Sequence, residues 1–97
     1  MPFLGFSRSH EYERHGMTNQ ELLDEISPIA MQVLRIPEFD SSVTMNSTPE
    51  WDSLAHVQLL SAIERKFAIE ISADEAFKLT SAEKLVRYLH DTLKGKQ

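Results

Sequence analysis

The chain of 97 residues has no cysteine. A disulfide framework, a thiolate metal site and a thiol nucleophile are therefore excluded, and any thiol chemistry must come from an added group. The chain also lacks an apolar run long enough to cross a bilayer, so we expect no membrane partner. The apolar start at residues 1–6 is too short for the core of a signal peptide, and charged residues follow it, which favours a cytoplasmic protein.

Basic residues are scarce as well. Lys and Arg number 10 against 15 Asp and Glu, which gives a formal net charge of −5. Because binding to nucleic acid depends on clustered basic side chains, this balance argues against it and favours protein partners with basic faces. The four histidines show no metal-ligand spacing, so we expect no metal site.

The length and the hydrophobic content of 41% fit one small domain around a single core, and a monomer is the simplest expectation. Residues 1–16 lack helical periodicity, and we interpret them as a disordered N-terminal extension or a tag. The predicted domain therefore spans residues 17–97.

Apolar periodicity predicts a first helix in this domain. Thr18 and Glu21 have the spacing of a capping box, and the helix should end before Pro37. Pro28 removes one helical hydrogen bond at a cost of about 3 kcal/mol, so we expect either a kink near Glu25 or two short helices that meet at Ser27 and Pro28. The predicted apolar face consists of Leu22, Ile26, Ile29 and Val33.

A long connection rich in turn-forming residues follows over residues 36–50. We expect Phe39, Val43 and Met45 to pack it against the core, as an ordered crossing between helices that run in similar directions. Trp51 is either a buried contact that holds this loop or an exposed partner contact, and the packing of a large aromatic beside a long loop favours the buried contact.

Three further helices are predicted after the loop. The second spans about Ser53 to Phe67, and a third, short helix begins at Ser72 and ends near Lys78. Between them residues 69–71 read as a buried linker rather than a strand. Thr80 and Glu83 have the spacing of a capping box that opens the last helix. The predicted fold is an all-α four-helix bundle with a long loop between the first two helices and a short third helix.

Ser53 lies where the polar loop meets the second helix, and this position has two interpretations. One is a plain N-cap serine, which is a common use of the residue. The other is an attachment point, because a phosphate ester there would meet free backbone N–H groups and the positive end of the helix dipole. A catalytic triad of Asp52, Ser53 and His56 is not favoured, since the sequence offers neither an enclosing pocket nor an oxyanion-hole motif, and we expect no enzymatic activity.

From Thr18 to Leu93 the chain resembles the acyl carrier protein family, which includes peptidyl and aryl carriers. The most specific part begins with Asp52, Ser53 and Leu54, and the similarity continues through a short acidic helix to Leu79 and Thr80. Between these ends it rests on the ordered apolar positions Val57, Leu60, Ile63, Phe67, Ile69 and Ile71.

The resemblance implies that Ser53 is esterified with 4′-phosphopantetheine, which a Mg²⁺-dependent phosphopantetheinyl transferase takes from coenzyme A. The thiol of this arm would carry a substrate as a thioester between an acyl- or aminoacyl-loading enzyme and a downstream transferase or synthase. By the same resemblance Asp52 helps the transferase to hold its Mg²⁺, while Leu54 and Val57 flank the arm and contact partner enzymes.

Several positions differ from the pattern of fatty-acid carriers. Glu50 stands where a glycine is usual, and Phe77 stands where a glutamate is common in the third helix. The second helix offers His56, Gln58, Arg65 and Lys66 where acidic residues are usual, with Glu64 as its one acidic side chain. We therefore hypothesise a carrier dedicated to a polyketide, nonribosomal-peptide or other specialised pathway.

Two residues of this region are further candidates for partner contact. We interpret His56 as a surface residue beside the arm. Phe77 either completes the core or is exposed to partners, and the sequence leaves both interpretations open. The alternative function, from another class, is a small helical protein-protein interaction module without a prosthetic group.

Overall fold

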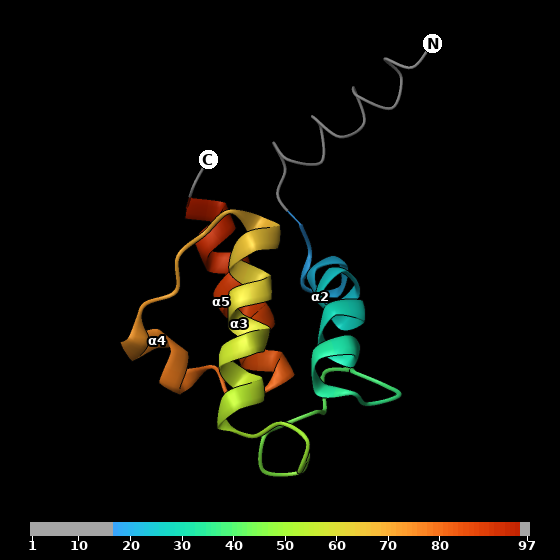
Figure 1. The fold of residues 1–97 in the computed structure, drawn as a ribbon. Helices are drawn as coiled ribbons and strands as arrows, with labels where there is room; N and C mark the ends of the chain where they lie inside the picture. Colours follow the sequence, from blue (N-terminus) through green and yellow to red (C-terminus); the bar gives the residue numbers. More distant parts are fainter. Residues whose placement is uncertain (1–16, 96–97) are drawn as a thin grey trace.

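The structure is a computed structural model that describes residues 17–95. Its described part contains the helices α2 (Asn19–Leu34), α3 (Ser53–Phe67), α4 (Ala73–Lys78) and α5 (Ala82–Gly95), and no β-strand. Figure 1 shows α2, α3 and α5 side by side as a bundle, with the short α4 at its side. The predicted all-α fold with a long loop and a short third helix is confirmed. The prediction for residues 1–16 lies outside the described residues.

Helix α2 begins with the predicted capping box. The Thr18 side chain accepts from the Glu21 backbone N–H at 3.1 Å, and the Thr18 N–H donates to the Glu21 carboxylate at 2.8 Å. The helix ends at Leu34, before Pro37 as expected, with Arg35 in the left-handed region at φ 59°.

Helix α2 runs through Pro28 as one element, so the alternative of two short helices is wrong. Burying a Leu or Ile side chain stabilises by roughly 1.5–3 kcal/mol, and Leu22, Ile26 and Leu34 are all buried on one face of this helix. Their combined burial outweighs the cost of about 3 kcal/mol for one interior proline, whose ring here is exposed.

The loop between α2 and α3 does not join helices that run in similar directions. Figure 1 shows α2 and α3 running in opposite directions, so the loop crosses one end of the bundle and that expectation is wrong. Phe39 is buried, and Val43 and Met45 pack against the core, as predicted. The loop also pairs with the start of α5, since Met45 N–H donates to the Thr80 carbonyl at 3.0 Å and Ala82 N–H to the Val43 carbonyl at 2.9 Å.

A second local feature orders this loop. The Ser42 hydroxyl and the Ser42 N–H both donate to the Asp40 carboxylate. These hydrogen bonds lower the pKa of Asp40 below its ordinary value, the bond from the hydroxyl having the larger effect.

The segment after α3 has no strand, which confirms the linker prediction. Its Ile69 is buried, and the Ile71 N–H donates to the Glu64 carboxylate at 2.7 Å. Helix α4 then begins after its N-cap Ser72 and ends at Lys78 as predicted.

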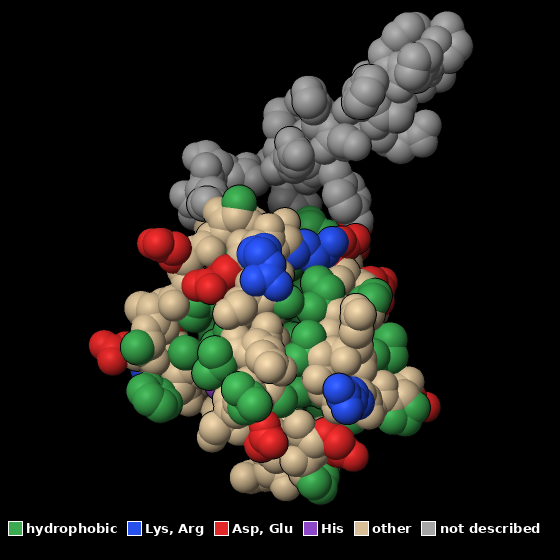
Figure 2. Space-filling view, in the orientation of Figure 1, with side chains coloured by type: hydrophobic (Ala, Val, Ile, Leu, Met, Phe, Trp, Pro, Cys, Tyr) green, Lys and Arg blue, Asp and Glu red, His purple; other side chains and the backbone are tan. Residues whose placement is uncertain are grey.

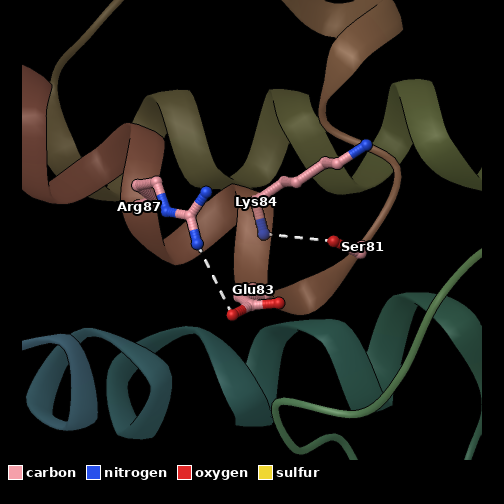
Figure 3. Close-up of polar contacts among 4 residues, drawn as sticks. All are labelled: Ser81, Glu83, Lys84 and Arg87. Atoms are coloured by element: carbon pink, nitrogen blue, oxygen red, sulfur yellow. Dashed lines mark hydrogen bonds and ion pairs between the residues drawn. The ribbon is translucent and has the colours of Figure 1, made fainter.

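The N-cap of helix α5 (Ala82–Gly95) lies one residue after the predicted cap. The Ser81 hydroxyl, rather than that of Thr80, accepts from the Lys84 N–H at 3.1 Å, as Figure 3 shows. The Thr80 carbonyl is engaged by the loop at Met45, so the chain is still extended there. The capping box of Thr80 and Glu83 is therefore wrong; Glu83 instead pairs with Arg87 at 3.5 Å on the exposed face.

One hydrophobic core joins the helices and the loop. No helix among residues 17–95 has both the length and the apolar character needed to cross a membrane. The buried apolar side chains are Leu22, Ile26, Ala30, Leu34, Phe39, Trp51, Ala55, Leu59, Leu60, Ile63, Ile69, Leu79, Ala82, Leu85, Val86 and Leu89.

Candidate functional site

Ser53 is the first residue of α3 and is exposed. It is not the N-cap, because that position belongs to Asp52, whose carboxylate accepts from the Ala55 N–H at 2.9 Å. The interpretation of Ser53 as a plain N-cap serine is therefore wrong. No hydrogen bond joins the Ser53 hydroxyl to another residue within the described range 17–95, and its oxygen is left accessible at the end of the helix.

The backbone around Ser53 suits a phosphate ester. The first N–H groups of a helix have no acceptor within the helix, and Asp52 occupies the one that belongs to Ala55. The N–H groups of Ser53 and Leu54 have no acceptor in the helix and point outward from its N-terminal end, where the dipole is positive. The first turn of α3 contains no acidic side chain. A covalently attached phosphodiester fits this end of α3 on both counts.

Three large hydrophobic side chains are exposed on α3 and α4. Leu54, Val57 and Phe77 are 67%, 61% and 81% exposed, and we refer to these three residues as the apolar patch. Leu54 and Val57 lie three residues apart on one side of α3, and Phe77 comes from α4. Figure 2 shows hydrophobic side chains on the face formed by α3 and α4. Of the two interpretations of Phe77, exposure is the one that the structure adopts.

The apolar patch is not surrounded by acidic side chains of α3. Residues 53–63 contain none, and the Glu64 carboxylate accepts from the Ile71 N–H. Lys66, near the other end of α3, pairs with Glu25 of α2 at 2.9 Å. The exposed side of α3 over residues 53–63 therefore carries no acidic side chain, and the exposed acidic residues nearest to Ser53 in the chain are Asp52 and Glu50, before the helix.

His56 is buried, with 9% of its surface exposed, so its interpretation as a surface residue is wrong. The Trp51 Nε1–H donates to His56 Nδ1 at 3.0 Å, and His56 Nε2 lies 2.9 Å from the Ala76 carbonyl oxygen. Position 56 therefore faces the loop and α4. Both ring nitrogens have partners, as burial of a polar side chain requires, so neither is free to act as a base toward Ser53.

Trp51 is a buried contact of the loop, as predicted. It is 2% exposed, and its ring centroid lies 5.9 Å from that of Phe39 and 5.8 Å from that of His56. It thus fixes the chain two residues before Ser53. Among residues 17–95, no three His, Asp or Glu side chains form a group that could hold a metal ion.

Sequence reasoning missed the bridge that His56 forms between Trp51 and Ala76. The separations are five residues to Trp51 and 20 residues to Ala76. No local periodicity indicates the second contact. A lone histidine three residues after Ser53 was the available signal, and it did not distinguish a buried bridge from a surface side chain.

The chain is similar to known proteins. Residues 24–89 match the family described as "Phosphopantetheine attachment site". An acyl carrier protein of Cyanidioschyzon merolae (strain NIES-3377 / 10D) is 31% identical over 75 residues, which are 75% of this chain and 82% of that relative. One of Campylobacter hominis is 32% identical over 80 residues, 78% of this chain and 99% of the relative.

A third similar protein is the acyl carrier protein of Rubrobacter xylanophilus, 32% identical over 75 residues that cover 75% of this chain and 93% of the relative. No solved structure matches this chain. The family match and the relatives together show that the chain belongs to the acyl carrier protein family and carries 4′-phosphopantetheine as its covalent cofactor.

Proposed function

We propose that Ser53 carries the 4′-phosphopantetheine and that the protein delivers a thioester-bound substrate in a specialised pathway. The observation that carries this proposal is the accessible Ser53 hydroxyl at the first position of α3. Two other serines at helix starts differ from it. The hydroxyls of Ser72 and Ser81 accept from Glu75 and Lys84 as caps, whereas Asp52 caps α3 and leaves Ser53 free of that role.

Each residue of the attachment end has a distinct part in the proposed mechanism. The Ser53 oxygen loses its proton and forms a bond to the phosphorus of the phosphopantetheinyl group of coenzyme A, while the P–O bond of the diphosphate breaks and adenosine 3′,5′-bisphosphate leaves. The free N–H groups at the start of α3 stabilise the charge of the phosphodiester. Asp52 helps the phosphopantetheinyl transferase to hold its Mg²⁺. When bound, the group supplies the thiol that this cysteine-free chain lacks.

The protein itself has no catalytic part in this proposal. His56 has both ring nitrogens engaged, and the Asp52 carboxylate accepts the Ala55 N–H. The loading enzyme and the downstream transferase or synthase therefore supply the chemistry. The chain positions the thioester for them through Leu54, Val57 and Phe77.

Intact mass spectrometry tests the attachment site. After incubation with coenzyme A and a promiscuous phosphopantetheinyl transferase, the parent protein should gain one phosphopantetheine group and Ser53→Ala should gain none. Ser61→Ala is the matched control, since it removes another hydroxyl from the same helix, and it should be modified like the parent. Modification of Ser53→Ala would contradict the proposed site. An unmodified parent would favour the interaction module without a prosthetic group.

The specialised pathway is supported by the apolar character of the face beside Ser53. Partners of this face should bind chiefly through apolar contacts, which salt affects little, whereas charge pairs at a surface weaken as salt screens them. We therefore expect weak binding to a ketosynthase of housekeeping fatty-acid synthesis, measured by titration at low and at high salt. Tight, salt-sensitive binding would contradict a dedicated carrier.

A further inference from the structure

The His56 side chain joins three segments of the protein. It belongs to α3, it accepts from Trp51 at the end of the loop, and it reaches the Ala76 carbonyl in α4. The partners determine its tautomer. The Trp51 indole nitrogen can only donate and a carbonyl oxygen can only accept, so His56 Nδ1 carries a lone pair and Nε2 carries the proton.

Few other contacts join helix α4 to the rest of the bundle. It contains six residues, and none of its side chains is buried. Its hydrogen bonds at Glu75, Ala76 and Leu79 lie within the segment 72–79. Within the described residues 17–95, the hydrogen bond that links residues 73–78 to another segment is the one from His56 Nε2 to the Ala76 carbonyl.

This bond lies directly beside Phe77. Ala76 is half-buried, and the next residue, Phe77, is 81% exposed. On the α3 side, His56 is followed by the exposed Val57. The bond therefore joins the backbone next to Phe77 to the helix that carries Leu54 and Val57, while the imidazole itself is buried.

We infer that His56 is a positioning residue, whose Nε2–H holds α4 so that Phe77 and the α3 side chains form one docking surface for an apolar partner site. The inference rests on the proposed function, in which the apolar patch contacts partner enzymes. His56 therefore acts on docking through α4.

Two conservative substitutions separate the two bonds of His56. In His56→Gln the amide nitrogen lies at the distance of Nε2 from the backbone, so it can still donate to the Ala76 carbonyl. In His56→Asn the amide oxygen lies at the distance of Nδ1, so it can still accept from Trp51 but cannot reach α4. His56→Phe removes both bonds and keeps a ring in the same space.

The first measurement concerns the protein alone. Hydrogen exchange of the amides of residues 76–79 should be about five- to tenfold faster in His56→Asn and His56→Phe than in the parent, because a hydrogen bond contributes about 1 kcal/mol. His56→Gln should stay within about twofold of the parent, since it keeps the bond. Exchange in α2 and α5 should be unchanged in all variants that fold. Equal exchange in the Gln and Asn variants would overturn the positioning role.

The second measurement concerns docking, with the promiscuous transferase and coenzyme A as the probe. The KM for the carrier should rise about five- to tenfold in His56→Asn, as in Phe77→Ala, while kcat stays near that of the parent and His56→Gln retains the parental KM. A KM that changes with Phe77→Ala but not with His56→Asn would overturn the inference. A change in α4 exchange without modification of Ser53 in the parent would instead contradict the proposed function and leave the positioning role standing.

If His56→Phe does not fold, the Gln and Asn pair decides alone. If neither of these folds, Trp51→Phe keeps the histidine and removes only the bond to Nδ1. If the amides of residues 76–79 in Trp51→Phe exchange at the parental rate, the bond from His56 to Ala76 holds α4 without the bond from Trp51, and the inference is supported. Exchange as fast as that of the unfolded chain would overturn it.

Discussion

At the attachment end, the side chains on either side of Ser53 in the chain, Asp52 and His56, have defined partners, whereas the hydroxyl proposed to be modified has none among residues 17–95. Asp52 caps α3, and His56 uses both ring nitrogens within the structure. Ser53 stands between them and remains accessible. The neighbours are thus rigidly held while the hydroxyl is available to a transferase, which is the arrangement a covalent attachment site needs.

The cap formed by Asp52 and its proposed role toward Mg²⁺ can be separated by substitution. Asp52→Ala removes the cap and should lower the free energy of unfolding by about 1 kcal/mol, whereas Asp52→Asn keeps a capping oxygen and should change it little. Both variants should be modified at Ser53 more slowly, because neither offers a carboxylate near the Mg²⁺ of the transferase. Thermal unfolding and the rate of mass gain measure the two effects. An Asn variant modified at the parental rate would contradict the Mg²⁺ role.

At the scale of helices, caps and buried faces decide where each element begins and ends. Helix α2 keeps an interior proline because its buried face outweighs the lost hydrogen bond. Helix α5 begins at Ala82 because the preceding carbonyl of Thr80 is paired with the loop. Helix α4 is too short to bury a side chain of its own and depends on its flanking residues and on His56.

The start of α5 provides a test of cap assignment. Ser81→Ala should lower the free energy of unfolding by about 1 kcal/mol, since the Lys84 N–H loses its side-chain acceptor. Thr80→Ala is the matched control and should cost less, because Thr80 contributes its backbone carbonyl, which alanine retains. Urea unfolding of both variants measures the difference. A larger loss in Thr80→Ala would contradict the assignment of Ser81 as the cap.

At the scale of the whole molecule, large apolar side chains are divided between the core and the apolar patch. Trp51, the largest, is buried against Phe39 and holds the loop to the bundle. Leu54, Val57 and Phe77 remain exposed beside the attachment end. The same type of residue therefore stabilises the fold in one place and is available for partner binding in the other.

Alanine substitutions at the two kinds of position should have opposite consequences. Trp51→Ala should lower the free energy of unfolding by about 3–5 kcal/mol, because it leaves a cavity in the core. Leu54→Ala should change stability by no more than about 0.5 kcal/mol, as for other exposed sites, while raising the KM of partner enzymes. Denaturant unfolding and steady-state kinetics measure these effects. A stability loss for Leu54→Ala as large as that for Trp51→Ala would contradict the division.

Much of this structure follows from local sequence patterns. The bounds of α3, with Ser53 at its start, the capping box of Thr18 and Glu21 and the burial of Trp51 were all predicted. The helix bounds and the capping box depend on contacts three or four residues apart, which can be read from one sequence, and the burial of Trp51 follows from the tendency of a large aromatic side chain to pack in the core.

Only the tertiary structure decided the remaining features. The opposite directions of α2 and α3, the pairing that shifts the start of α5 to Ala82, and the exposure of Phe77 depend on how distant segments pack. The clearest case is His56, whose burial requires an acceptor 20 residues away at Ala76. The sequence alone determined that a helix starts at Ser53, whereas the structure determined that Asp52 caps it and which neighbours hold that end in place, because a buried polar group depends on partners brought together by the fold.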